Sequence, residues 1–424
     1  MTDTVLERPV HSSPDADRYQ DVLTTPHVGR LLVGAVTGHL PVAMAPPALL
    51  LAVRADHGTL ALAGLLAAIF GLTAAFGQPL WGRCLDRRGH TLTLAVTAVA
   101  SSTTFAVLAT IHTPTHPWTA AVLTAIAGLT TPPLEAALRV LWPHVLRHDA
   151  QRRAALALDA SAQEVVFIAG PLLVLALEAI TGPRTVLTAT AVIGLAGTAL
   201  FATTPPARTW QPTPTASRDW LGPLAPTGTR LLAVGLFGAG VTLGALNVVA
   251  LTTSERHHAG YLATLIPAAL AVGSLTGGLL YGRRQWRTTP AAQLRHASTG
   301  LLLGLLPLLT DPPTPLAIIA AALPGLFLAP TLITCFTALE DLAPAGTLAE
   351  ATAWLIASLG LGQAAGTALA SAPSPLPQAP TAVALLGAFL SCLLFTTHQL
   401  HITPVTGQKI PLPTKPSTPL RTSR

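Results

Sequence analysis

Long apolar stretches, separated by short polar or charged segments, run through most of the chain. A helix needs about 20 apolar residues to cross the hydrocarbon core of a bilayer. Within each stretch the apolar residues follow one another without the alternation of a barrel strand, so the pattern predicts membrane-spanning helices and an all-α membrane protein. We expect twelve such helices, at residues 28–53, 59–82, 91–111, 117–141, 154–178, 184–203, 230–252, 259–281, 293–310, 315–339, 347–371 and 380–400.

The composition agrees with a membrane protein. Charged residues make up 10% of the 424 positions and hydrophobic residues 50%, whereas soluble domains have about 25% charged residues. A soluble protein of this length would be left with large apolar surface patches. The composition therefore excludes an ordinary soluble enzyme, a disordered chain and, despite the net charge of +6, a nucleic-acid-binding protein. The excess of arginine over lysine, with abundant alanine and proline, suggests a bacterial source.

Basic residues indicate the orientation in the membrane. With twelve spans and both termini on the inner side, 21 of the 24 Lys and Arg residues fall in inner segments, and the outer loops hold only Arg54, Arg184 and Arg256. Cytoplasmic segments of membrane proteins carry such an excess of basic residues. We therefore predict a multi-pass protein of the cell (plasma) membrane with both termini in the cytoplasm.

A hydrophilic stretch rich in Pro and Thr, at residues 204–229, divides the spans into two sets of six. We predict an N-terminal six-helix bundle over residues 28–203 and a C-terminal one over residues 230–400, joined by this extended cytoplasmic linker. The tails at residues 1–27 and 401–424 are rich in Pro, Thr and Arg, and we expect them to be cytoplasmic and disordered.

The two sets resemble each other at an offset of 200 residues. Residues 77–83 (GQPLWGR) align without a gap with residues 277–283 (GGLLYGR), so that two glycines, a leucine, an aromatic residue and an arginine coincide. The match falls at the end of the second span of each set, where an internal repeat predicts it.

The segment after the second span, residues 82–91 (GRCLDRRGHT), resembles the loop signature G-x-L-A-D-R-x-G-R-R of the major facilitator superfamily. Gly82, Asp86, Arg87 and Gly89 fit the signature, whereas a cysteine replaces its leucine and its last two basic positions carry His and Thr. The glycines allow a tight turn and a close approach of helices. The resemblance implies the fold of that family, in which twelve helices form two pseudo-symmetric six-helix bundles.

The same resemblance implies a conformational latch. In the family, the aspartate of this loop lies near the start of the eleventh helix. Here that helix begins with a capping-box pattern, with Thr347 as N-cap and Glu350 three residues later. We expect Asp86 to lie against this helix N-terminus and Arg87 to pair with an acid on a neighbouring helix, so that both hold the halves together in the outward-facing state. In the alternative interpretation the arginines of the loop only set the topology.

Acidic residues inside a span are costly and therefore mark candidate functional sites. Glu164 lies about ten residues, or roughly 15 Å, from the basic end of the fifth span, and Asp159 lies about half as deep. Burial favours the neutral form of a carboxyl group, which suits reversible protonation. We therefore expect Glu164, and after it Asp159, to couple transport to protons. The alternative for both is a structural hydrogen bond or an ion pair with Arg139.

On the fourth span, Glu135 and Arg139 are four residues apart, and we predict a structural ion pair rather than a substrate clamp. Drug/proton antiporters of the family often carry a basic residue midway along this helix, where the chain instead has residues 128–133 (GLTTPP). Gly170 and Pro171 match the core of the fifth-helix glycine motif of those antiporters, but its flanking glycines are missing. The resemblance to antiporters is therefore partial.

Helices one, four, seven and ten line the central cavity in the family, which makes His39 and Asn247 candidate substrate-cavity residues. For His39 the alternative is a structural hydrogen bond. Trp118 and Trp142 lie at the ends of the fourth span, and we expect them to anchor it at the membrane interface.

No cofactor or metal site is predicted, because the three cysteines are far apart and no GxxxxGK[ST] nucleotide loop or catalytic constellation is present. We therefore predict a transporter, not an enzyme, that acts as a monomer on a small molecule and protons. The expected function is secondary active transport by alternating access, as proton-coupled efflux of a drug or metabolite. The alternatives are proton-symport import of a neutral solute, and a non-transporting scaffold or sensor on the same fold.

Overall fold

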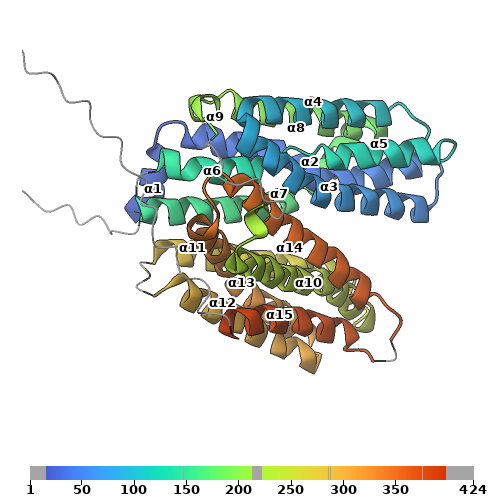
Figure 1. Ribbon diagram of the computed structural model, residues 1–424. Helices are drawn as coiled ribbons and strands as arrows, with labels where there is room; N and C mark the ends of the chain where they lie inside the picture. The colour runs from blue at the N-terminus through green and yellow to red at the C-terminus, as the bar shows by residue number, and fades with distance from the viewer. Residues whose placement is uncertain are drawn as a thin grey trace, which may run out of the picture.

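The computed structural model describes residues 16–146, 148–212, 222–284, 286, 288–374 and 376–397. In this part of the chain every regular element is a helix (Figure 1). The elements are α1 (Ala16–Thr24), α2 (Val28–Ala55), α3 (Leu60–Arg88), α4 (His90–Leu108), α5 (Pro117–Leu129), α6 (Leu134–Val145), α7 (Asp149–Thr181), α8 (Pro183–Ala202), α9 (Pro205–Thr209), η1 (Gly222–Leu224), α10 (Thr227–Arg256), α11 (Leu262–Arg283), α12 (Pro290–Leu305), η2 (Leu306–Thr310), α13 (Thr314–Leu342), α14 (Leu348–Ala370) and α15 (Ala379–Thr397).

Eleven spans of the described part are long and apolar enough to cross a membrane, with α5 and α6 counted as one. A twelfth helix, α12, has 16 residues and continues into the 3-10 helix η2. Each predicted span therefore corresponds to one helix or to two consecutive ones. Some helices extend past the predicted boundaries, as α3 does to Arg88 and α7 back to Asp149, because a helix can continue beyond the bilayer while its backbone hydrogen bonds still close.

The fourth span is interrupted between α5 and α6, at residues 130–133 (TTPP). Its two prolines have no N–H to donate and disfavour helical backbone before them. Other donors reach the two carbonyls that the prolines leave unpaired: the Thr131 N–H donates to the Gly128 carbonyl at 3.0 Å, and the Trp81 indole donates to the Leu129 carbonyl at 2.7 Å. Such donors allow a membrane bundle to contain a broken helix.

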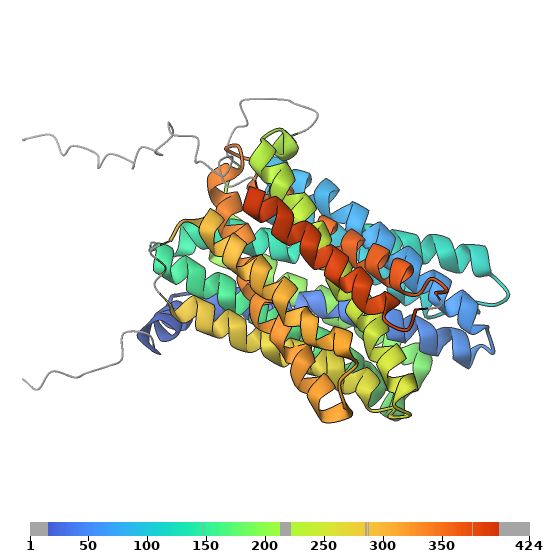
Figure 2. The ribbon, with the colours of Figure 1, turned by 90° about the horizontal axis from the view of Figure 1, so that it is seen from below.

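The helices form two six-span halves, an N-half (α2 to α8) and a C-half (α10 to α15). The halves are closest where α3 ends and α14 begins, and they move apart toward the loops that join α2 to α3 and α14 to α15 (Figure 1). We call the first of these the terminal end, since α1 also lies there, and the opposite one the far end. Figure 2 shows that the helices of both halves run roughly along one direction. Between the halves, α3 packs against α14 and α7 against α11, with further contacts of α6 with α14 and of α7 with α13.

The positions aligned by the 200-residue offset occupy equivalent places. Trp81, at the end of α3, donates to the Leu129 carbonyl of α5. Tyr281, at the end of α11, accepts a hydrogen bond from the Thr334 hydroxyl of α13 at 2.8 Å. In each half, the aromatic residue thus connects the second span to the fourth, as an internal repeat requires.

The predicted tails and linker contain more helix than expected. Residues 16–24, within the tail at 1–27, form α1, which packs against α2 and α7. The linker predicted at 204–229 contains α9 and η1, and α10 already begins at Thr227. Residues 1–15, 213–221 and 398–424 lie outside the described residues.

The two tryptophans of the fourth span differ in environment. Trp118, at the start of α5, is 84% exposed, as an interfacial residue would be. Trp142, near the end of α6, is 0% exposed and packs in the hydrophobic core at the terminal end. The predicted anchoring role is therefore wrong for Trp142, because α6 lies inside the molecule against α2, α7 and α14.

At the far end, Asp56 joins three segments of the N-half. The carboxylate follows α2 and accepts hydrogen bonds from the Thr113 N–H at 2.9 Å and from Arg184 Nη2 at 2.6 Å. Burial alone would raise the pKa of Asp56, but the hydrogen bonds from Arg184 and Thr113 outweigh it and hold the pKa below its ordinary value of 3.8.

We expect Asp56→Asn to lower the free energy of unfolding by roughly 1–3 kcal/mol at neutral pH, because the buried Thr113 N–H and the Arg184 side chain lose a charged acceptor. A depressed pKa stabilises the fold above the unfolded-state value and loses that stabilisation as pH falls through the folded-state value. The difference in melting temperature between the wild type and Asp56→Asn in detergent should thus stay constant from pH 7 to pH 5 and shrink below the ordinary value of 3.8. Glu255→Gln, at an exposed position near the end of α10, is the control. A difference that grows in acid would contradict this assignment.

Candidate functional site

The contact between the halves at the terminal end is built around Asp86, in the last turn of α3. Its carboxylate is buried (6% exposed) and accepts hydrogen bonds from the backbone N–H groups of Ala349 at 3.1 Å and Glu350 at 2.8 Å, in the first turn of α14. The first N–H groups of a helix have no partner within the helix and carry the positive end of its dipole. Asp86 of the N-half therefore caps a helix of the C-half.

This arrangement replaces the capping box predicted at the start of α14. Thr347 makes no side-chain cap bond, and its hydroxyl donates instead to the Pro344 carbonyl at 2.8 Å. The Glu350 side chain pairs with Arg83 rather than turning back to Thr347. The capping-box prediction is wrong because Asp86 already accepts from the N–H groups that Thr347 would cap.

Arg83, one turn before Asp86 on α3, makes the ion pair between the halves. Its Nη2 lies 2.5 Å from Glu350 Oε1, and η1 of the linker packs against α14 beside this pair. Arg87, which the sequence predicted to pair with an acid, is exposed and forms no salt bridge within the described residues. Arg87 lies one helical turn nearer the end of α3, where its side chain reaches solvent.

The two signature glycines have distinct roles in this contact. A Cβ at Gly82 would lie 2.8 Å from the Ala349 carbonyl oxygen and 2.8 Å from Ala353 Cβ, so only glycine lets α3 approach α14 this closely. Gly89 joins α3 to α4 with φ 83°, a backbone conformation that favours glycine.

A second group of charges surrounds Arg139 of α6. Arg139 Nε donates to Asp159 Oδ2 of α7 at 2.8 Å, and Arg139 Nη1 lies 3.9 Å from Glu135 Oε2. Arg139 and Asp159 are 7% and 2% exposed. Charges buried this deeply are tolerated when they are paired. For Asp159 the structure therefore contains the alternative, an ion pair with Arg139, and the predicted Glu135–Arg139 pair is the longer of the two.

The two candidate cavity residues lie in different halves. His39 of α2 is half-buried and close enough to Asp159 to interact electrostatically, and its Nδ1 makes no hydrogen bond within the described residues. Asn247 is exposed on α10, a helix whose other residues are mostly buried, beside Leu246 of the same helix and Ile266 of α11.

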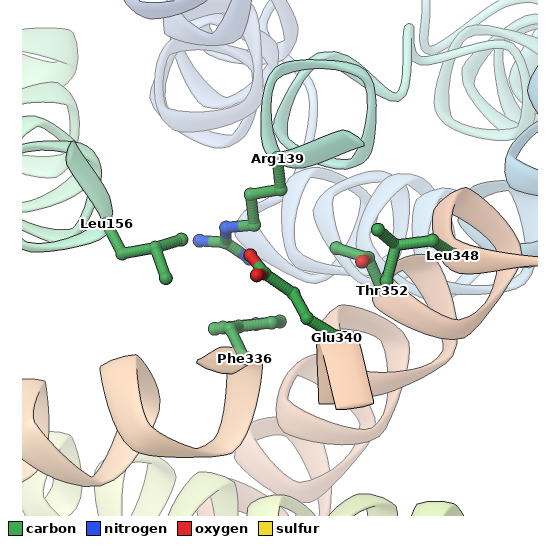
Figure 3. A pocket seen from close by; sticks show the side chains of 6 residues that line it. All are labelled: Arg139, Leu156, Phe336, Glu340, Leu348 and Thr352. Atoms are coloured by element: carbon green, nitrogen blue, oxygen red, sulfur yellow. The ribbon is translucent and has the colours of Figure 1, made fainter. Parts of the chain in front are cut away.

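Arg139 also reaches the C-half. Its guanidinium carbon lies 3.6 Å from the centroid of the Phe336 ring on α13, within cation–π range. Glu340, one turn further along α13, is directed to the same place, and Leu348 and Thr352 of α14 close it (Figure 3). The space among these side chains does not admit a water molecule. This is therefore a packed contact between the halves and not a binding cavity.

Glu164 of α7 also faces the C-half, but it lies against α11 and not at the Arg139 contact. Its carboxyl lies close to the Ser274 hydroxyl of α11, which is buried and makes no hydrogen bond within the described part of the chain. Asp159 and Glu164 point about 140° apart around the helix, as five residues of separation predict. The structure therefore does not bring the two proton-coupling candidates together.

Sequence reasoning missed the roles of Arg83 and Phe336. Arg83 stood within the loop signature and the internal repeat, which could have singled it out. Phe336 is one apolar residue in a helix of 29 residues, and nothing in the sequence distinguishes it. Among the described residues, no group of three or more His, Cys, Asp or Glu could hold a metal ion.

The sequence model of the Major Facilitator Superfamily matches residues 31–367. No curated protein matches the chain by sequence.

Several solved structures have a similar fold. The human organic anion transporter MFSD10 (TETRAN) is similar with a TM-score of 0.63 and 18% identity, over 92% of this chain and 100% of that one. A bacterial homologue of the iron transporter ferroportin, in an outward-facing state, has a TM-score of 0.66 and 14% identity, over 89% and 98% of the two chains. The E. coli fucose:proton symporter FucP has a TM-score of 0.61 and 14% identity, over 87% and 97%. At these identities the likeness extends to the fold alone.

Proposed function

The chain belongs to the Major Facilitator Superfamily, whose members are secondary transporters, and we propose that it exports a small molecule in exchange for protons by alternating access. The observation that carries this proposal is the placement of two carboxyl groups at contacts between the halves. Asp86 of α3 lies against α14, and Glu164 of α7 lies against α11. Each stands where the halves must separate for the second state of the cycle.

In the orientation predicted from the basic residues, the terminal end faces the cytoplasm. The halves touch at that end and move apart toward the far end (Figure 1), which corresponds to an outward-facing state. Gly82, Asp86 and Gly89 then form the latch of this state, with Arg83 supplying the ion pair that was expected of Arg87.

Glu164 is the proposed proton carrier. A carboxyl group that is covered by α11 in one state and hydrated in the other binds protons with different affinity in the two states. Asp159 is the second candidate and is paired with Arg139 in the present state. His39 and Asn247 are the proposed substrate contacts, on the central helices of the two halves. With so few polar groups there, the substrate is proposed to be mainly apolar.

We expect Glu164→Gln to reduce substrate-driven proton movement at least tenfold, because the amide cannot release a proton. The protein would be reconstituted into liposomes with an acidic lumen and a pH-sensitive dye, and a panel of small apolar compounds added outside. Glu178→Gln, the same change 14 residues later on α7, is the matched control and should behave as the wild type.

The sign of the dye signal separates the candidate functions. Exchange makes the lumen more alkaline as substrate enters, whereas symport makes it more acidic. No proton movement with any compound would favour the scaffold or sensor. Full proton movement in Glu164→Gln would remove Glu164 from the proposal and leave Asp159.

A further inference from the structure

Arg139 belongs to the N-half, but its side chain contacts both halves. Its Nε is fixed by Asp159 at 2.8 Å, while its guanidinium carbon lies 3.6 Å from the centroid of the Phe336 ring. The helix that carries Arg139, α6, starts just after the break in the fourth span and packs against α14. The helix that carries Phe336, α13, packs against α7. The contact thus lies where four helices of the two halves meet (Figure 3).

We propose that Phe336 is a positioning residue of the transport cycle, whose ring receives the Arg139 guanidinium and holds the terminal end closed. This inference rests on the proposed alternating-access function and deepens it. Asp159 and Glu135 pair with Arg139 within the N-half, and when the halves close its guanidinium lies over the electron-rich face of Phe336 in the C-half, beside Glu340.

The geometry favours a cation–π contact over simple apolar packing. Arg139 is nearly fully buried, and its Nη1, which lies 3.9 Å from Glu135 Oε2, makes no hydrogen bond within the described residues, so the guanidinium is shielded from water. No water molecule fits among the lining side chains, so the π face of Phe336 is not screened. A cation–π contact that excludes water favours association by up to about thirtyfold, and one exposed to water by a few-fold.

Four of the helices around this contact, α2, α6, α7 and α13, carry titratable side chains near it. His39 of α2, Glu135 of α6 and Asp159 of α7 lie on the side of the N-half. Glu340 of α13 lies on the side of the C-half, and α14 contributes Leu348 and Thr352. Arg139 forms salt bridges to Glu135 and Asp159 within the N-half, and it meets the C-half at the ring of Phe336, beside Glu340.

Fluorination of the ring tests this proposal without changing its shape. Phenylalanine carrying one, two or three fluorine atoms would be placed at position 336 of the full-length protein in nanodiscs, because each fluorine weakens the negative potential of the ring face. Spin labels on Arg88→Cys and Arg230→Cys, exposed positions of the N-half and C-half at the terminal end, would report the distance between the halves. The native cysteines would be replaced by alanine.

We expect the ratio of closed to open terminal ends to fall stepwise with each fluorine, by about tenfold to thirtyfold over the series. Phe336→Leu should give a loss at least as large. The same series at Phe327, an exposed residue of α13, is the control and should give no change. A flat series at position 336, or equal series at both positions, would overturn the proposal.

The distance measurement tests the role of Phe336, and the liposome assay tests the proposed exchange, so each proposal can be contradicted without the other. If no compound moves protons but fluorination opens the terminal end, the proposed exchange fails and the role of Phe336 stands. If protons move and the series at position 336 is flat, the role of Phe336 fails and the exchange stands.

Discussion

Replacing Arg139 with leucine is expected to lower the free energy of unfolding by about 3–5 kcal/mol, the largest effect of any single exchange proposed for this chain. The change leaves the Asp159 carboxylate 2% exposed and without the donor that now lies at 2.8 Å. A buried charge deprived of its partner bears the full cost of leaving water. Thermal unfolding of the purified protein in detergent, followed by the exposure of its buried cysteine, would measure the loss.

A double mutant separates the contribution of the Arg139–Asp159 ion pair to stability from that of side-chain packing. Arg139→Leu combined with Asp159→Leu removes both charges, and we expect it to regain most of the stability lost in Arg139→Leu, because no lone charge remains buried between the two positions. Arg208→Leu, on the exposed surface of α9, is the control and should change stability by less than about 0.5 kcal/mol. An equal loss of stability in the single and the double variant would show that the buried Asp159 carboxylate is not stabilised by Arg139.

The second large effect is expected for Asp86→Asn. Two backbone N–H groups of α14 donate to the Asp86 carboxylate, and hydrogen bonds to a charged group contribute about 1.5–3 kcal/mol each. The amide retains one acceptor and turns a donor toward the second N–H. We expect a loss of about 2–3 kcal/mol from the contact, which shifts the balance between closed and open terminal ends by roughly 30- to 150-fold. Distances between spin labels across the terminal end would measure the shift, and transport should slow with it.

Thr347→Ala is the matched control for Asp86→Asn. Thr347 is the N-cap that the sequence predicts for α14, but its hydroxyl bonds to Pro344 and not to the first turn of the helix. We expect little change in conformational balance from this exchange. A larger effect at Thr347 than at Asp86 would mean that α14 is capped from its own chain, and the role assigned to Asp86 would be lost.

The spans could be predicted from the sequence because their signal is local. Apolar runs of the length of a bilayer correspond to helices throughout the described chain, and the repeated aromatic residues Trp81 and Tyr281 connect equivalent spans. Trp142 was misplaced because its position at the end of a span predicts an interface, whereas the packing of α6 against three other helices buries it. That packing depends on the association of the two halves, which no local pattern contains.

The candidate site was predicted in part for the same reason. The place of Asp86 followed from a family signature, and an ion pair of Asp159 with Arg139 was among the alternatives. Which alternative holds depends on the angle between α6 and α7, and this angle follows from tertiary packing. Arg83 and Phe336 gain their partners from the opposite half, more than 190 residues away in the chain. Nothing near them in the sequence indicates such a partner.

The hydrogen bonds of Asp86 bear on how this contact could change in evolution. Within the described part of the chain, the carboxylate accepts from main-chain N–H groups of α14 alone, and any residue except proline supplies such a group. The side chain at position 349, which is fully buried, is therefore restricted by its packing and not by this bond. Correlated substitutions between related sequences would then fail to reveal the pairing of Asp86 with α14, although they could reveal the pairing of Arg83 with Glu350. Covariation is therefore blind to this contact between the halves, although the loop signature points to Asp86 and the coordinates show the bonds.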